Sequence, residues 1–175
     1  PETMCAQASA SGGTQCRTPD PEPSCDSYCD LVTRHCFGEF ALYSSEEACS
    51  EYCHFVADFD EGILGETSGN TLACRIHYGN AVGLDDPEAG CAAAGPAGGN
   101  VCGSWGDNYC DLAMKNCDGE NALYDSRDSC MDACADLPVD DSSDALTGDA
   151  VQCRIDILGG PAYVNPELYC VDTSE

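Results

Sequence analysis

Sixteen cysteines are the residues of this sequence whose type and spacing could do chemistry. Oxidised in pairs they would form about eight disulfides, which is the chemistry of an oxidising compartment. Zinc binding is the rival use, but zinc sites favour Cys-x2-Cys pairs with complementary Cys or His. Here the close pairs are Cys-x3-Cys, and the chain has three histidines. Because large apolar residues are sparse, with four Phe and one Trp, we expect disulfides to replace a large core.

One close pair has a histidine directly after it. Cys49, Cys53 and His54 form Cys-x3-Cys-His, a relative of the c-type haem attachment signal. The corresponding place in residues 130–135 reads Cys-x3-Cys-Ala, so both cysteines return without the histidine. Structural disulfides explain both pairs, and a haem electron carrier is therefore the least favoured of three functional hypotheses.

The close pairs belong to a stretch that the chain contains twice. Residues 28–53 return as residues 109–134 with a constant offset of 81. Cys-Arg-Ile then follows in both copies, at 74–76 and at 153–155. This register predicts an internal repeat. We divide the chain into an extended Pro/Gly/Ser-rich lead-in, a first Cys-rich repeat and a second one, over residues 1–24, 25–91 and 92–175.

Each repeat is predicted to contain two short antiparallel helices. Cys29 and Cys36 are seven residues apart, and Cys49 and Cys53 are four apart, so each pair lies on one helix face. Nested pairing of two antiparallel helices gives Cys29–Cys53 and Cys36–Cys49. The same logic and the repeat give four more pairs: Cys110–Cys134, Cys117–Cys130, Cys74–Cys91 and Cys153–Cys170. The partners of four cysteines stay open: Cys5, Cys16, Cys25 and Cys102.

A third short helix is predicted after each pair, from about 71 to 82 and from about 150 to 158. Asn70 and Asp149 are suitable N-caps for these helices. The expected fold class is therefore mainly α: a small disulfide-rich protein of two tandem repeats, each a stapled antiparallel helical hairpin with a third short helix and loops.

The charge balance excludes several functions. With 32 acidic against six basic residues, the net charge is −26. Nucleic-acid binding needs a basic face, and insertion at an anionic membrane is disfavoured for the same reason. Such a surface attracts cations, and Ca²⁺ takes carboxylate oxygens. The acidic loops after the hairpins are candidate ligands, although neither matches an EF-hand and solvated acidic loops are the simpler interpretation: Asp58, Asp60, Glu61, Asp140, Asp141 and Asp144.

Enzyme signatures are missing from the sequence. It contains no nucleophile elbow, phosphate loop or His-Glu-x-x-His motif. No catalytic residue is assigned and no cofactor is required. Ser/Thr-rich segments near residues 8–18 and 142–147 are candidates for O-linked glycan.

A further motif bears on assembly. Pro-Glu precedes Cys5, Cys91 and Cys170, always with Pro four residues before Cys. The chain begins at Pro1 without a signal peptide, which suggests a trimmed secreted product. It starts and stops at the same phase of its repeat, so we expect either a piece of a longer tandem array or a subunit whose tail meets the head of the next.

Several strings together resemble a known group. Cys-x6-Cys, Ala-Leu-Tyr-Ser-Ser-Glu, Cys-x3-Cys, Ser-Gly-Asn-Thr-Leu-Ala-Cys-Arg and Ala-Gly-Pro-x-Gly-Gly-x-Val-Cys are similar to Cys-rich tandem repeats in uncharacterised secreted proteins of myxobacteria-like bacteria. The resemblance covers nearly the whole chain. It implies an extracellular or cell-surface location and supplies no catalytic residues.

The leading hypothesis is a non-enzymatic extracellular structural protein that associates head to tail into a fibre, as a homo-oligomer or filament. The alternative is a monomeric secreted or cell-surface binding module for Ca²⁺ or glycan. The third is the haem carrier described above.

Overall fold

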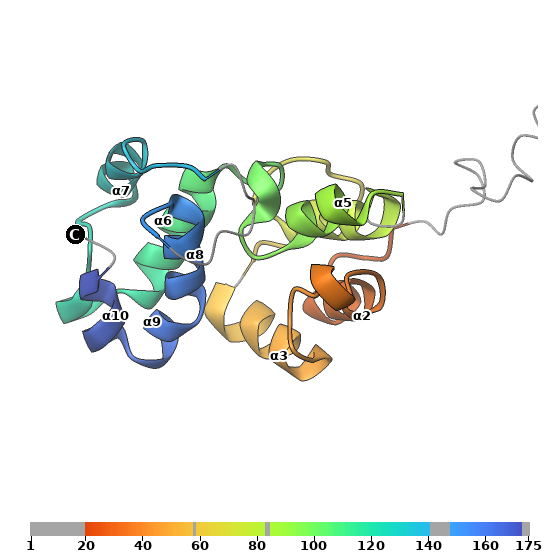
Figure 1. Ribbon diagram of the computed structural model, residues 1–175, viewed down its shortest axis with the longest axis horizontal. Helices are drawn as coiled ribbons and strands as arrows, with labels where there is room; N and C mark the ends of the chain where they lie inside the picture. Colours follow the sequence, from red (N-terminus) through yellow and green to blue (C-terminus); the bar gives the residue numbers. More distant parts are fainter. Residues whose placement is uncertain (1–19, 58, 83–84, 141–147, 173–175) are drawn as a thin grey trace, which may run out of the picture.

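The computed structural model describes residues 20–57, 59–82, 85–140 and 148–172, which form short helices joined by turns (Figure 1). The first repeat contains α2 (Cys25–His35), η1 (Gly38–Phe40), α3 (Glu46–Glu51), η2 (Tyr52–Ala57), α4 (Leu72–His77), η3 (Tyr78–Val82) and α5 (Pro87–Ala94). After η4 (Gly98–Asn100), the second repeat contains α6 (Trp105–Asn116), η5 (Gly119–Asn121), α7 (Arg127–Cys134), α8 (Val151–Gly159), α9 (Pro161–Val164) and α10 (Pro166–Asp172). The predicted mainly helical, disulfide-rich fold is confirmed. Within the described ranges no helix is long and apolar enough to cross a membrane.

The third helix of each repeat is also present. In the first repeat, α4 runs directly into the π-helical turn η3, and in the second repeat α8 takes the same place. The N-caps differ from the prediction. Thr71, and not Asn70, accepts the hydrogen bond from the Cys74 N–H, while α8 begins after Ala150 without a side-chain cap. Asn70 is therefore available for a different contact, described below.

Serine caps explain where the short helices begin. Ser24, Ser45, Ser104 and Ser126 each accept a backbone N–H three residues on, at the starts of α2, α3, α6 and α7. Such caps stabilise a helix by roughly 1 kcal/mol each. Helices of six to twelve residues are marginal alone, so packing and disulfides must hold them.

Each repeat has its own core, built on a tyrosine pair. In the first repeat Tyr28 is fully buried, and its hydroxyl donates to Ala94 O at 2.8 Å and lies 3.0 Å from Tyr43 Oη. In the second repeat the hydroxyls of Tyr109 and Tyr124 lie 2.8 Å apart. The offset of 81 relates the two pairs, so the repeat in sequence is a repeat in packing.

Disulfides staple the helical hairpins, but with pairings that correct the prediction. Cys29 bonds Cys49 and not Cys53, which bonds Cys25. The two helices are antiparallel, as expected, yet the register is shifted by one turn. The reason is spacing: Cys25 and Cys29 are four residues apart, as are Cys49 and Cys53, so two matched bonds can form.

The cysteine at the end of the first hairpin helix leaves the hairpin altogether. Cys36 is the C-cap of α2 with φ −101° and ψ 87°, and it bonds Cys91 on α5 and not Cys49. Cys117 is likewise the C-cap of α6, and it bonds Cys170 on α10 and not Cys130. Non-helical backbone at these positions directs the bond away from the facing helix.

One disulfide joins the two helices of the second hairpin, whereas two join those of the first. Cys110 bonds Cys130 and not Cys134, which is a buried free thiol. Gly106 stands where the repeat would place a counterpart of Cys25. A Cβ there would lie 2.9 Å from Met131 Cε, so the methionine side chain fills the space of the missing bond.

The remaining predicted pairs are also wrong. Cys74 bonds Cys102, which crosses the predicted boundary at 91/92, and Cys91 is taken by Cys36. Because Cys170 bonds Cys117, Cys153 is left as a second buried free thiol. The open cysteines Cys25 and Cys102 thus have partners, while Cys5 and Cys16 lie outside the described residues.

Candidate functional site at the junction of the two repeats

The two repeats meet along η2, α4 and α6. Val56 of η2 packs into the core of the second repeat beside Tyr109 and Ile155. Tyr52, also in η2, lies against α8: a Cβ placed on Gly159 would come within 2.9 Å of the Tyr52 hydroxyl oxygen. The first repeat therefore completes the core of the second.

Arg75, on α4, is the central side chain of this junction. It is fully buried. Its guanidinium donates to Gly95 O and Pro96 O, both at 3.2 Å, and to Asn108 Oδ1 at 2.7 Å. The guanidinium carbon also lies 3.9 Å from the centre of the Phe59 ring. Carbonyl dipoles and an aromatic face thus stabilise a buried cation.

Burial has the expected electrostatic effect on this site. Desolvation lowers the pKa of Arg75 below its usual value, although nearby tyrosines and Asp111 oppose the shift. Arginine nevertheless stays charged at neutral pH. Burial also raises the pKa of Tyr28 to about 12, so the adjacent phenol remains a neutral hydrogen-bond donor.

Asn108, near the start of α6, joins Arg75 to the segment that links the repeats. It is 2 % exposed. While its Oδ1 accepts from Arg75, its Nδ2 donates to Cys102 O at 3.2 Å and Ser104 O at 3.0 Å. One amide therefore fixes α4, α6 and the connecting segment relative to one another.

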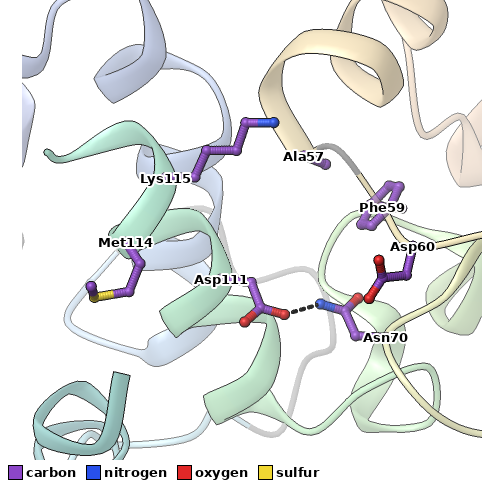
Figure 2. A pocket seen from close by; sticks show the side chains of 7 residues that line it. All are labelled: Ala57, Phe59, Asp60, Asn70, Asp111, Met114 and Lys115. Carbon is purple, nitrogen blue, oxygen red and sulfur yellow. Dashed lines mark hydrogen bonds between the residues drawn. The ribbon is translucent and has the colours of Figure 1, made fainter. Parts of the chain in front are cut away.

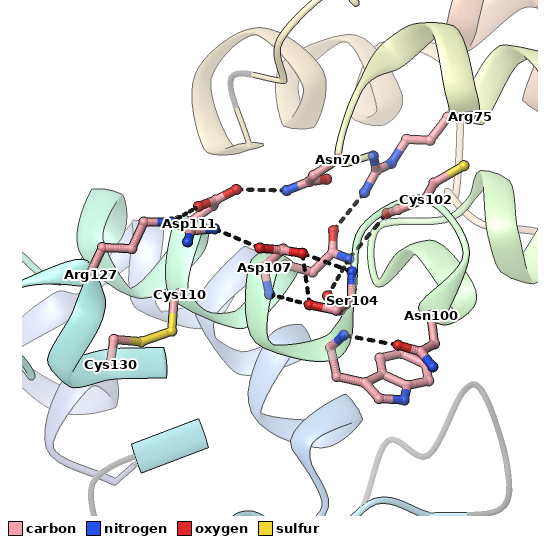
Figure 3. A network of polar contacts seen from close by, with 12 residues as sticks. Asn70, Arg75, Asn100, Cys102, Ser104, Asp107, Cys110, Asp111, Arg127 and Cys130 are labelled. Carbon is pink, nitrogen blue, oxygen red and sulfur yellow. Dashed lines mark hydrogen bonds and ion pairs between the residues drawn. A yellow bond between two sulfur atoms is a disulfide. The ribbon is translucent and has the colours of Figure 1, made fainter. Parts of the chain in front are cut away.

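A second polar chain runs from the junction to the surface (Figure 3). Asn70 Nδ2 donates to Asp111 Oδ2 at 2.8 Å, and Arg127 bridges Asp111 and Asp107 at 2.9 and 2.8 Å. Asp107 also accepts from the Ser104 hydroxyl and N–H. Burial alone would raise the pKa of Asp107, but these hydrogen bonds outweigh it and hold the pKa below 3.8.

A groove of about 370 Å³ opens between the repeats (Figure 2). Asp60 and Asn70 lie on one side of it, and Asp111, Met114 and Lys115 of α6 on the other. The Asn70 Oδ1 atom is buried without a hydrogen-bond partner. The groove is therefore lined by two carboxylates and an ammonium, while the Asn70 oxygen lies buried beneath its surface.

The predicted calcium ligands are not brought together among the described residues. Asp60 lines the groove, while Glu61 and Asp140 are exposed on separate loops. Asp58, Asp141 and Asp144 lie outside the described residues. Across the described ranges, the groove included, no group of three or more His, Cys, Asp or Glu side chains is placed to hold a metal ion.

The two cysteines of the haem hypothesis are not free thiols in this structure. The sulfurs of Cys49 and Cys53 are bonded to Cys29 and Cys25, and His54 is exposed beside Phe55. Thioether attachment needs two reduced thiols, which a bonded pair does not supply.

Sequence reasoning missed Arg75, Asn108 and Asn70 as junction residues. One signal was present, because Cys-Arg-Ile occurs in both repeats and places an arginine directly after a buried cysteine. Arg154, in the second copy, is buried as well. No sequence signal marked Asn108, whose counterpart in the first repeat is Ser27.

Fold and junction define a small all-helical, disulfide-stabilised repeat protein. Residues 22–105, just under half of the chain, match the family model of the BfoA family C-terminal domain. The matched residues include both Cys74 and Cys102. The segment 95–104, which contacts α4, is therefore part of the region that matches the family model. No curated protein and no solved structure matches the chain.

Proposed function

We propose that the chain is a non-enzymatic extracellular structural protein whose repeats associate head to tail into a fibre. The observation that carries the proposal is the junction itself. Arg75 and Cys74 on α4 of the first repeat bind the segment 95–104, which leads into α6 of the second repeat. Arg154 on α8 takes the place of Arg75 in the second repeat, where it is buried and pairs with Asp149.

The disulfides bear on where the protein would act. Six disulfides require an oxidising environment to form and persist. The resemblance to secreted tandem-repeat proteins supports an extracellular or cell-surface setting for the fibre. The charge of −26 opposes close contact between copies, so association at low salt must overcome repulsion.

Electron microscopy and sedimentation velocity of unreduced protein test this function. We expect elongated particles that lengthen with protein concentration, and more so at about 0.5 M than at about 0.02 M NaCl, because salt screens the repulsion. Discrete monomers at every concentration and salt level would contradict the proposal.

A monomeric binding module is the second candidate, and the groove between the repeats favours it. Asp60 and Asp111 bring carboxylates to one cavity, with the Asn70 amide hydrogen-bonded to Asp111, and such a lining is suited to Ca²⁺ or to the hydroxyls of a glycan (Figure 2). Calorimetric titration with CaCl2 at millimolar concentration tests the cation. Binding that disappears in Asp60→Asn but survives in Glu61→Gln would support this candidate, and the absence of heat would remove the calcium version of it.

A further inference from the structure

Most of α7 faces solvent, and one disulfide anchors it. Of its eight residues, Cys130 and Cys134 are the buried ones. Cys130 is bonded to Cys110 of α6, and both of these cysteines are fully buried. The Cys110–Cys130 bond is therefore the main attachment of α7 to α6.

Cys134 places a free thiol one helical turn from this anchor. It is the last residue of α7, and it belongs to the same core cluster as Cys110 and Cys130. Residues four apart share a helix face, with Cβ atoms about 5–6 Å apart. A disulfide needs about 3.5–4.5 Å between the Cβ atoms, a small adjustment at a helix end, where the backbone frays. The thiol and the disulfide that it could attack are thus neighbours.

The first hairpin contains no such thiol. Both cysteines at the matching places are bonded to α2, in the pairs Cys25–Cys53 and Cys29–Cys49. In the second hairpin Gly106 stands where the repeat would place a counterpart of Cys25. Of the two hairpins, the second alone therefore combines a disulfide and a free thiol on one helix face.

The anchored helix also carries a contact toward the junction of the repeats (Figure 3). Arg127, at the start of α7, bridges Asp107 and Asp111 of α6 at 2.8 and 2.9 Å. Asp111 in turn accepts a 2.8 Å hydrogen bond from Asn70 of the first repeat. Because the Cys110–Cys130 bond holds α7 on α6, it supports this whole polar chain.

We propose that the second hairpin is a disulfide latch, in which Cys134 takes Cys130 as its partner and releases α7 from α6. In the closed state, the one described above, Cys110 is bonded to Cys130. In the open state the Cys130–Cys134 bond lies within α7, and no disulfide joins the two helices. The inference goes beyond the proposed fibre function and does not depend on it, because both states lie within one chain.

Opening is an isomerisation that needs no external oxidant or reductant. The Cys134 thiolate attacks the Cys130 sulfur, and a new S–S bond forms as the bond to Cys110 breaks. Cys110 leaves as a thiolate and takes up the proton that Cys134 has lost. One disulfide and one thiol are present before and after the step.

Two features keep the latch closed at neutral pH. Burial raises the pKa of the Cys134 thiol, so little of the attacking thiolate is present. Arg127 binds both of its aspartates in the closed state and so favours α7 in its place on α6. Loss of these ion pairs should therefore increase the open fraction.

Peptide mapping of the unreduced full chain distinguishes the two states. The protein is incubated at about pH 8 to form thiolate, then quenched with acid and capped with N-ethylmaleimide. Cleavage before aspartates places Cys110, Cys130 and Cys134 in separate peptides, residues 107–110, 128–131 and 132–135. The closed state joins the first peptide to the second and caps the third. The open state joins the second to the third and caps the first.

Arg127→Met should open the latch more often. We expect the open product as a minor species in wild type, and its fraction should rise at least about threefold when both ion pairs are removed. Arg34→Met is the matched control, because it removes an exposed pair with Asp30 on α2 and should leave the open fraction unchanged.

Cys110→Ser should trap the open state. With oxidised glutathione as the electron acceptor, its Cys130 and Cys134 thiols should form one bond and yield two glutathione thiols. Arg127 should then hold Asp107 less tightly, so NMR titration should find a higher pKa for the Asp107 carboxyl than in wild type. Cys134→Ser is the control, since it keeps the Cys110–Cys130 bond and should keep the wild-type pKa of Asp107.

Three results would overturn the latch. They are an Arg127→Met chain without the open product, an exchange product that joins Cys134 to any cysteine other than Cys130, and a trapped Cys110→Ser chain with the wild-type pKa at Asp107. The mapping of Arg127→Met decides the matter even where Cys110→Ser fails to fold, because that variant retains every cysteine.

Discussion

Arg75 Nη2 donates a 2.7 Å hydrogen bond to Asn108 Oδ1, across 33 residues of chain and from one repeat to the other. Both side chains are buried, and each is also bonded to the segment between the repeats. Relative placement of the two repeats is therefore set by a specific polar contact as well as by apolar burial.

Replacing this arginine should destabilise the junction strongly. In Arg75→Met the carbonyls of Gly95 and Pro96 and the Asn108 amide oxygen lose their donor in a buried site. Unsatisfied buried groups of this kind cost about 1–3 kcal/mol each, so for three of them we expect a loss of at least about 3 kcal/mol in the free energy of unfolding. Chemical denaturation of the unreduced protein measures it.

The control for that experiment is Arg34→Met. Arg34 pairs with Asp30 on the exposed face of α2, one turn away. Exposed pairs of this type contribute about 0.3–0.5 kcal/mol. Equal losses in the two variants would contradict the role given to Arg75.

Close packing at the second contact between the repeats should be sensitive to one methyl group. In Gly159→Ala the new Cβ would meet the Tyr52 hydroxyl at 2.9 Å and ring carbon Cε2 at 3.1 Å. Overpacking of this kind costs about 1–3 kcal/mol. Gly160→Ala is the matched control, because its Cβ would meet nothing nearer than 3.7 Å. Thermal unfolding should separate the two variants, with the larger decrease in Tm for Gly159→Ala.

Gly106→Cys should restore the bond that the second hairpin lacks. The introduced thiol would stand opposite Cys134 as Cys25 stands opposite Cys53, and the flexible end of Met131 must move aside. Closing a loop of this size stabilises by roughly 2–4 kcal/mol in the chain-entropy view. A mass loss of two hydrogens and one fewer alkylatable thiol would confirm the bond, and an unchanged thiol count would contradict the assigned register.

Low pH should weaken the hydrogen bonds and the ion pair of the Asp107 carboxylate and so reduce the stability of the fold. Because the folded state lowers the pKa of this carboxyl, its contribution is fully present above the unfolded pKa, near 4. That contribution is lost as the pH falls through the still lower folded value. We expect Asp107→Asn to be less stable than wild type at pH 7 and to lose less stability between about pH 5 and pH 2. Glu120→Gln, at an exposed site on η5, is the control and should follow the wild-type profile.

The helices could be predicted from sequence, whereas none of the six predicted disulfide pairs is the one observed. The spacing of four residues between Cys49 and Cys53 predicts a helix there, and the repeat predicts its counterpart in the second half of the chain. Both predictions hold because helical periodicity is a local property. Cys36 was misassigned because its partner depends on where α5 packs, which is a tertiary property. Asn70 was expected to cap a helix, but Thr71 caps it and Asn70 binds the other repeat.

Arg75 illustrates a more general limit. Arginine is rarely fully buried, and composition alone argues for a surface position. Its burial depends on carbonyls of Gly95 and Pro96 that come from a segment twenty residues away. No local pattern contains that information, although the recurrence of Cys-Arg-Ile pointed to the residue.

The disulfides give the first repeat a mechanical property. Between Cys25 and Cys102 the chain has 77 residue steps, but the covalent path through Cys36–Cys91 has only 22, and the path through Cys25–Cys53 and Cys74–Cys102 has 21. At about 3.5 Å per residue, a fully stretched repeat would span on the order of 80 Å in place of about 270 Å. Under tension such a chain would behave as a nearly inextensible cord, whose length remains limited after its helices have unravelled.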